Sequence, residues 1–485
     1  MKRRTLVTGL LSTPFWACFP NVSATSQQAD LVSALIHTPR STLTADVVQQ
    51  IRNGSIRKPA LIKALLSAGV SHIEPRPVGF KYHAVLMVDA ARRLSLQAEG
   101  IASWIPILWN VDYFKHSQAR SLRISGWTLE DANAQLPLIG QAPDLFTRSM
   151  QTKQWQQADQ AITRMARSGS MYAAFELMLE WAVKDFHSIG HKAILLSGVV
   201  RCLEYSGWDG SETILRGVTY ALLADGNVTA DKEKGWWEKD YPENLRLAHK
   251  IPGSAFLPLA PEKDTQRLLK KVRQLDARSS SELAAERLQQ GLPMQCVWDA
   301  VFLAAADAVM NRPNIPMLHC ITVSHALYSL WQRTTNTTMR RVIPLQALSY
   351  VVQMKQQRPG SAWNNFDILD LKAAPPNSAS LANQLDQLGN AIGTDHIEAR
   401  DLLRRYPLND GWWTLKQQLN SWLLSKSNKA HDFKYGAAVL ETVEWISPQW
   451  RTPYLAACSR LLMGENMPDS NEGQNINEWM GGAFS

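Results

Sequence analysis

Hydrophobic residues recur along this chain at the spacing of three and four positions that an amphipathic α-helix requires. Residues 176–186 (ELMLEWAVKDF) alternate apolar and charged side chains on that period. Alternation with a period of two is nearly absent, and runs of β-branched residues are short. We therefore expect an all-α protein, with further helices at 298–310, 318–331, 399–405, 412–424 and 435–446.

Proline and glycine mark three breaks in this pattern, at 136–143, 251–263 and 356–380. The last break is long enough for an exposed excursion or a lid. No fixed period of about 30 to 50 residues is evident, which argues against a regular solenoid but leaves an irregular one open. We expect one large multi-helical domain over residues 25–485, with long loops rich in proline and glycine and with a two-lobed arrangement left open.

The N-terminus has the features of an export signal. Arg3 and Arg4 precede a short apolar run at 6–19, which is too short to span a bilayer, and small residues follow it. Twin arginines are typical of the Tat exporter, which moves folded proteins. We expect a Tat-type signal peptide at 1–24, recognition by the Tat machinery and a periplasmic mature protein. An ordinary Sec signal and a lipoprotein cut at Cys18 are the alternatives.

Composition excludes some partners. The formal net charge of +8 is diffuse apart from the signal, and no basic run is interleaved with aromatic residues, so nucleic acid is a poor candidate. No later stretch is apolar for long enough to cross a membrane. The cysteines beyond the signal form no CxxC pair, and their apolar helical surroundings predict buried free thiols: Cys202, Cys296, Cys320 and Cys458.

Four histidines are the strongest candidates for chemistry: His83, His191, His319 and His431. Each lies in an apolar, helix-like segment, where burying an unpaired imidazole is costly. Neutral imidazole is also a common ligand of zinc, iron and copper. A fold that brought the four together would make a nitrogen-rich metal site, and scattered core histidines are the alternative.

Local spacing narrows the roles of neighbouring residues. His187 and His191 form HxxxH, but Gly190 interrupts the helix and Ser188 stands where a zinc peptidase has glutamate. Gly190 instead predicts a turn that opens a helix at 193–205.

His325 lies six residues after His319, roughly 120° around a helix, so one of them is expected to bind an ion and the other to support it. His431 and Lys434 are three residues apart and can reach a common point, although Lys434 also fits a solvated surface lysine.

Several of these segments together resemble the questin oxidase-like proteins, which are helical oxygenases known from fungal aromatic polyketide pathways. The most specific piece is HCITVSHAL at 319–327, which fits the pattern H-x-(V/I)-T-x-x-H-A-L. His83, the Gly190-His191 turn and the late H-x-x-K of His431 and Lys434 follow the family order. The chain departs from the pattern where the early helix keeps only His83, and at Lys192 and Leu195, which replace a proline and a second histidine.

The resemblance implies a mononuclear non-haem Fe(II) centre that reacts with dioxygen and a small molecule, aromatic or quinoid in the known members. Its ligands would be His83, His191, His319 and His431, with Lys434 able to bind as a carbamate after carboxylation. His325 would orient a ligand or meet the substrate, so His325 and Lys434 are the residues expected to take part in catalysis.

The functional hypothesis is therefore a metal-dependent oxidoreductase. Zinc on the same ligands, serving a hydrolase, is one alternative. A non-catalytic exported binding or scaffold protein is the other, and it predicts histidines that lie far apart. The sequence contains neither the paired Glu-x-x-His motifs of ferritin-like di-iron proteins nor a G-x-S-x-G elbow.

Overall fold

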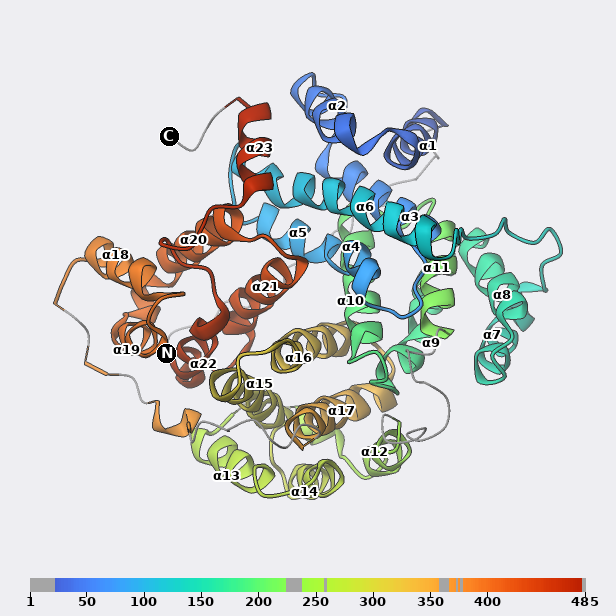
Figure 1. Cartoon of the computed structure of the whole chain (residues 1–485). Helices are drawn as coiled ribbons and strands as arrows, with labels where there is room; N and C mark the ends of the chain where they lie inside the picture. The colour runs from blue at the N-terminus through green and yellow to red at the C-terminus, as the bar shows by residue number, and fades with distance from the viewer. Residues whose placement is uncertain are drawn as a thin grey trace, which may run out of the picture.

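Helices joined by short turns build the whole of the described chain, as the computed structural model shows (Figure 1). The structure describes residues 22–223, 238–256, 260–356, 366–371, 374–375 and 378–481, and these contain no strand. The all-α class predicted from the sequence is confirmed. The α-helices are α1 (Val22–His37), α2 (Arg40–Arg52), α3 (Lys58–His72), α4 (His83–Leu86), α5 (Val88–Ser95), α6 (Ile105–Ile124), α7 (Ala142–Gln151), α8 (Trp155–Arg167), α9 (Met171–Val183), α10 (His191–Ser206), α11 (Glu212–Leu223), α12 (Tyr241–Ala248), α13 (Glu262–Val272), α14 (Ala277–Gln289), α15 (Met294–Asn311), α16 (Ile315–Arg333), α17 (Thr337–Gln356), α18 (Leu381–Ala391), α19 (His396–Arg405), α20 (Leu408–Lys426), α21 (Ala430–Trp445), α22 (Arg451–Cys458) and α23 (Asn471–Trp479).

Each predicted helix is present, but the bounds differ by up to five residues; the helix expected at 435–446, for example, is α21 and begins at Ala430. The helix expected at 176–186 ends at Val183, and the turn that follows it carries two consecutive positive φ angles before α10, 53° at Ile189 and 79° at Gly190. The break expected at 136–143 is present between α6 and α7. Much of the break at 356–380 lies outside the described residues, as does the predicted signal peptide except for residues 22–24, which begin α1.

Helix α16 runs through the middle of the molecule, with α10, α15, α17 and α21 packed against it (Figure 1). Apolar residues occur all around α15 and α16, and almost every residue of both helices is buried, which is the pattern of an interior helix. Helix α5 contacts both α10 and α21 and closes the remaining side. Outer helices α13 and α14 cover α15 and α17, while α7 and α8 pack at the side of the molecule against α9 and α11.

The four inner elements that carry the candidate histidines present them near their N-terminal ends. His83 and His191 are the first residues of α4 and α10, while His319 and His431 lie in the first turns of α16 and α21. Histidines that are far apart in sequence are therefore delivered by the starts of mutually packed helices.

Two further expectations can be compared with this fold. The four cysteines beyond residue 22 are free and buried, as predicted: Cys202, Cys296, Cys320 and Cys458. Among the described residues, no helix combines the length and hydrophobicity needed to cross a membrane.

Candidate metal centre

A tight turn before α10 fixes the direction of His191. Gly190 has φ of 79°, a left-handed conformation, and a Cβ atom added there would lie 2.5 Å from Cγ2 of Val323 on α16. Only glycine lets the two backbones approach this closely. The turn is held on both sides, since the Tyr350 hydroxyl donates to the Ile189 carbonyl over 3.0 Å and Lys192 forms a buried ion pair with Asp185.

His83 is oriented by the short segment that precedes it. Its Nδ1 lies 2.8 Å from the carbonyl oxygen of Phe80, which has an unusual φ of 47°. A carbonyl only accepts hydrogen bonds, so Nδ1 carries the proton and Nε2 presents a lone pair. The preceding Gly79 packs against the imidazole of His191, since a Cβ there would lie 3.0 Å from its Nδ1.

His319 is fixed in the same manner. The Asn314 side chain accepts from the Met317 backbone and caps α16, and Nδ1 of His319 donates to the Ile315 carbonyl over 2.7 Å. Nε2 of His319 is therefore also free to present a lone pair. Backbone carbonyls that fix the tautomer in this way are the usual support of metal-binding histidines.

These side chains converge on one point. Ligand atoms of His83, His191 and His319 all lie within 4.8 Å of one another, and all three residues are buried. The Nε2 atoms of His191 and His319 are 2.9 Å apart. The ring of His431 lies beside these three, with its centroid 4.5 Å from that of His83 and 5.3 Å from that of His319, but the group of converging ligand atoms does not include it.

The residues present fit a bound cation. His83 Nε2, His431 Nε2 and Lys434 Nζ are buried nitrogens that have no hydrogen-bond partner among the described residues. Most buried polar atoms in folded proteins are paired, so three such atoms beside one cluster indicate a common missing partner. The 2.9 Å separation of the two Nε2 atoms also suits neighbouring ligands of one ion, which lie ~3 Å apart when each bond is ~2.1 Å.

Electrostatics keep the cluster in its metal-binding protonation state. Burial, assisted by the neighbouring cationic groups, lowers the pKa values of His83, His191 and His319 well below the usual range. Burial and the nearby Lys434 lower the pKa of His431 to about 3. The imidazoles are therefore neutral at pH 7, the form that binds metals.

Lys434 is not a surface lysine, because it is 3% exposed. Burial lowers the pKa of Lys434 to about 7, so a large share of its amine carries a free lone pair at neutral pH. Its Nζ adds a fifth nitrogen beside the histidine cluster.

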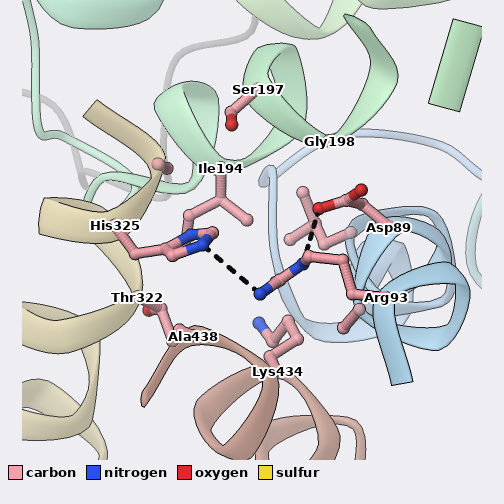
Figure 2. A pocket seen from close by; sticks show the side chains of 12 residues that line it. Asp89, Arg93, Ile194, Ser197, Gly198, Thr322, His325, Lys434 and Ala438 are labelled. Atoms are coloured by element: carbon pink, nitrogen blue, oxygen red, sulfur yellow. Dashed lines mark hydrogen bonds and ion pairs between the residues drawn. The ribbon is translucent and has the colours of Figure 1, made fainter. Parts of the chain in front are cut away.

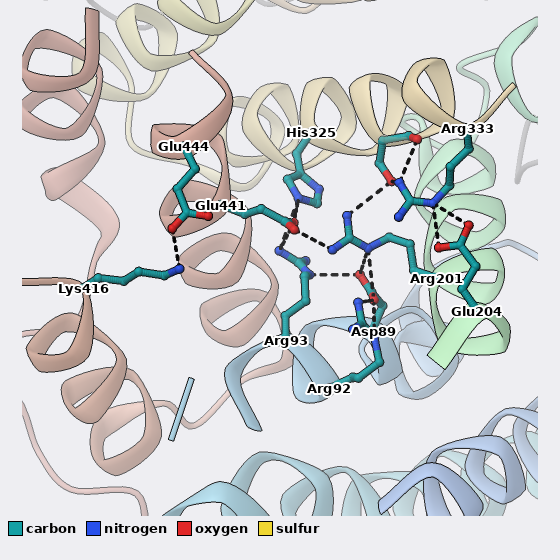
Figure 3. Close-up of polar contacts among 11 residues, drawn as sticks. Asp89, Arg92, Arg93, Arg201, Glu204, His325, Arg333, Lys416, Glu441 and Glu444 are labelled. Atoms are coloured by element: carbon teal, nitrogen blue, oxygen red, sulfur yellow. Dashed lines mark hydrogen bonds and ion pairs between the residues drawn. The ribbon is translucent and has the colours of Figure 1, made fainter. Parts of the chain in front are cut away.

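His325 lies outside the group of converging ligand atoms and belongs to a neighbouring buried ionic network (Figure 3). Its Nε2 lies 2.6 Å from Oε2 of Glu441 and 3.3 Å from Nη1 of Arg93. Glu441 also accepts from Arg201 over 2.7 Å, and Asp89 accepts from Arg92, Arg93 and Arg201.

The charges in this network are largely compensated. Burial alone raises the pKa of Asp89, but the three guanidinium groups outweigh it and hold the pKa below the usual range. Burial and the adjacent Arg93 lower the pKa of His325 to about 4, so His325 accepts no second proton at pH 7 although Glu441 favours one. A neutral His325 therefore donates from Nε2 to the carboxylate of Glu441.

A small cavity lies against this network (Figure 2). Lys434 is the candidate ligand in its wall, which includes none of His83, His191, His319 and His431. The volume of the cavity is about 20 Å³, and a water molecule needs roughly 10–15 Å³ of such space. It takes a molecule the size of water or dioxygen but no aromatic ring. Polar residues in its wall include Asp89, Arg93, Ser197, Thr322, His325 and Lys434.

Sequence reasoning brought forward the histidines and Lys434 but missed the ionic network. Asp89, Arg92 and Arg93 offered a signal, since an acid and two bases at helical spacing stand inside an otherwise apolar helix. Glu441 and Arg201 offered none. His187 lies in the turn before α10 and so shares no helix with His191, as the glycine between them predicted.

No protein-family model matches the chain, and comparisons with curated proteins and with solved structures give no match. What the structure shows is a buried triad of His83, His191 and His319 that could hold a metal ion, inside an all-α fold.

Proposed function

We propose that this chain is a non-haem iron oxidoreductase of the questin oxidase-like type, acting with dioxygen on a small molecule. The observation that carries the proposal is the convergence of buried imidazole nitrogens beside His431 Nε2 and Lys434 Nζ, which have no hydrogen-bond partner in the described part of the chain. The alternative of scattered core histidines does not fit rings with centroids 4.5 to 5.3 Å apart.

His83, His191, His319 and His431 would hold the iron. Imidazole suits iron, copper, nickel and zinc alike, so the ligands do not choose the metal. The resemblance of the sequence motifs favours iron, and metal analysis distinguishes it from a hydrolytic zinc. When bound, iron(II) would supply the electrons that allow dioxygen to react with an organic molecule.

Lys434 would act as an adjustable ligand. A neutral amine attacks carbon dioxide, forming an N–C bond and releasing one proton, and the resulting carbamate presents an anionic oxygen. The lowered pKa of Lys434, near 7, provides the neutral amine that this step needs. An anionic ligand would partly offset the charge of the metal in this dry site.

His325 would position molecules in the cavity. Its ring lies in the cavity wall that also contains Lys434, and its Nε2 donates to Glu441, which holds it in place (Figures 2 and 3). The aromatic or quinoid substrate that the family resemblance suggests would need space that this cavity does not provide, so its binding would require movement of the cavity wall.

Export of the folded, metal-loaded protein to the periplasm by the Tat machinery is part of the proposal, and the Arg3-Arg4 pair supports it.

Metal analysis tests the proposal. Protein exported through its own N-terminus should contain one iron per chain, and His191→Ala or His431→Ala should remove most of it. The exposed His249 gives a matched control, since His249→Ala should keep full occupancy. Full iron in both cluster variants would reject the site. Stoichiometric zinc, with activity indifferent to oxygen, would instead support the hydrolase.

A further inference from the structure

Redox-active side chains lie in contact from the cavity to the protein surface. The ring of His325 stacks on Trp445 with centroids 4.6 Å apart and planes inclined by 17°. Trp445 lies 4.9 Å from Tyr328, and Tyr328 lies 5.3 Å from Trp331. We call these four residues the aromatic chain.

The position of the aromatic chain relative to the cavity is what makes it informative. His325 is both the first ring of the chain and part of the cavity wall that also contains Lys434 (Figure 2). His325, Tyr328 and Trp331 follow one another at intervals of three residues on α16, so each ring lies roughly 60° around the helix from the one before it. Trp445 joins them from the last turn of α21, the helix that carries His431 in its first turn.

The outer end of the aromatic chain reaches solvent. Trp331 is half-buried, and its indole nitrogen donates to the Arg340 carbonyl over 2.8 Å. The Arg340 guanidinium lies 5.5 Å from the ring of Trp331, and Phe256 stacks beyond that ring with a centroid distance of 6.4 Å. Arg341 lies 5.9 Å from Phe256, which makes the rim around this end basic.

An enclosed redox site needs a path for electrons. The cavity admits no molecule as large as an organic reductant, and the three triad histidines are each at most 7% exposed. Tryptophan and tyrosine are the side chains most readily oxidised by one electron, and electrons cross between rings in van der Waals contact. A path of such rings lets a donor at the surface serve a metal that it never touches.

We propose that the aromatic chain conducts electrons, one at a time, from a reductant at the surface near Trp331 to the metal centre. This inference rests on the proposed function, because it needs a site that dioxygen makes strongly oxidising. The site gains one electron from Trp445. Trp445 then takes an electron from Tyr328, and Tyr328 takes one from Trp331. The external donor, an anionic enediol or thiolate suited to the basic rim, finally loses that electron. Tyr328 releases its phenolic proton when oxidised and takes a proton back when reduced, so the path as a whole carries electrons only.

Light-driven oxidation tests the path in the iron(II)-loaded protein. A photogenerated ruthenium(III) polypyridine removes one electron from a side chain at the protein surface. The radical spectrum then identifies the side chain that carries the unpaired electron. In metal-free protein we expect a tyrosyl radical that is lost in Tyr328→Phe. In iron(II)-loaded protein the radical should decay at least tenfold faster, because iron(II) reduces it by one electron. The iron(III) formed should be detected by electron paramagnetic resonance.

Trp445→Phe interrupts the aromatic chain while keeping a ring against His325 and Tyr328. In this variant the radical lifetime of the loaded protein should return to that of the metal-free protein, with iron occupancy unchanged. Trp412→Phe is the matched control, since Trp412 is also half-buried and its indole bonds the Glu444 carboxylate. It should behave as the wild type.

The outcomes separate the two proposals. Equal radical lifetimes in iron-full and metal-free wild type, or fast decay that persists in Trp445→Phe, would overturn the aromatic chain and leave the metal site standing. A wild-type protein that takes up no iron would overturn the proposed function, and the proposed electron path would then lack its acceptor.

Discussion

The Nε2 atoms of His191 and His319 lie 2.9 Å apart in the interior of the protein. Nδ1 of His319 already donates to the Ile315 carbonyl, so in the neutral ring Nε2 of His319 can only accept. His191 must therefore carry its proton on Nε2 when no metal is bound. A metal ion that binds both nitrogens would displace that proton to Nδ1 or release it.

The cluster should make the stability of the metal-free protein depend on pH. The unfolded chain takes up protons on His83, His191 and His319 as pH falls through 6.5, whereas the depressed pKa values prevent this in the folded state. The unfolded state then binds more protons, so the free energy of unfolding falls as pH decreases below 6.5, by up to ~1.4 kcal/mol per pH unit for each histidine.

Urea unfolding of metal-free protein between pH 7.5 and about 5, where few carboxylates titrate, measures this slope. His319→Gln should reduce it and His249→Ala should not, because His249 is exposed. Equal stabilities across this range would contradict the buried neutral state of the cluster.

Gly190→Ala should displace His191. A side chain at φ of 79° costs ~1–2 kcal/mol, and the overlap with Val323 adds ~1–3 kcal/mol of overpacking. We expect the free energy of unfolding to fall by the sum of these two costs, together with reduced iron occupancy. Gly169→Ala provides the control, since Gly169 has φ of 75° but nothing within 4 Å of the added Cβ. Full metal content in Gly190→Ala would show that the close approach to α16 does not position His191.

The helices were predictable from sequence because α15 and α16 are long apolar segments with few helix-breaking residues, limited by Pro293, Pro313 and Pro316. The histidines were predictable as candidates because each imidazole stands alone in an apolar segment. Their convergence was not, since it depends on how α4, α10, α16 and α21 pack, and no local pattern encodes that arrangement.

The ionic network shows the same limit. Glu441 lies on α21 and Arg201 on α10, and each alone looks like an ordinary charged helix position. Only the packing of both helices against α5 brings the two into an ion pair at 2.7 Å. The cavity beside this network is likewise a product of tertiary packing.

Asp89→Asn should be among the most damaging single changes outside the cluster. The carboxylate balances Arg92, Arg93 and Arg201, and all four side chains are at most 10% exposed. Removing one partner of a buried ionic network costs ~3–5 kcal/mol, because the remaining charges stay buried. Chemical unfolding measures the effect. The exposed pair of Arg167 and Glu212 supplies a control, where Glu212→Gln should cost at most ~1 kcal/mol. Equal, small losses in both variants would mean that water reaches Asp89.

Lys434→Met separates the structural and metal-binding roles of the buried amine. Nζ of Lys434 has no hydrogen-bond partner among the described residues, so replacing it with an apolar chain of similar size should leave the metal-free protein as stable, or ~1 kcal/mol more stable. Lys63→Met is the matched control, because Lys63 is buried too but donates to the carbonyls of Gly207 and Asp209, and its loss should destabilise the protein.

The same variant tests the carbamate. Removing dissolved carbon dioxide and bicarbonate should weaken iron binding by the wild type, because the anionic oxygen ligand is lost, and should not affect Lys434→Met. Isothermal titration with iron(II) under oxygen-free conditions measures both affinities. If carbon dioxide has the same effect on the two proteins, Lys434 is not the residue that it modifies. If Lys434→Met is destabilised as strongly as Lys63→Met, the amine of Lys434 has a structural partner and is not available to bind a metal.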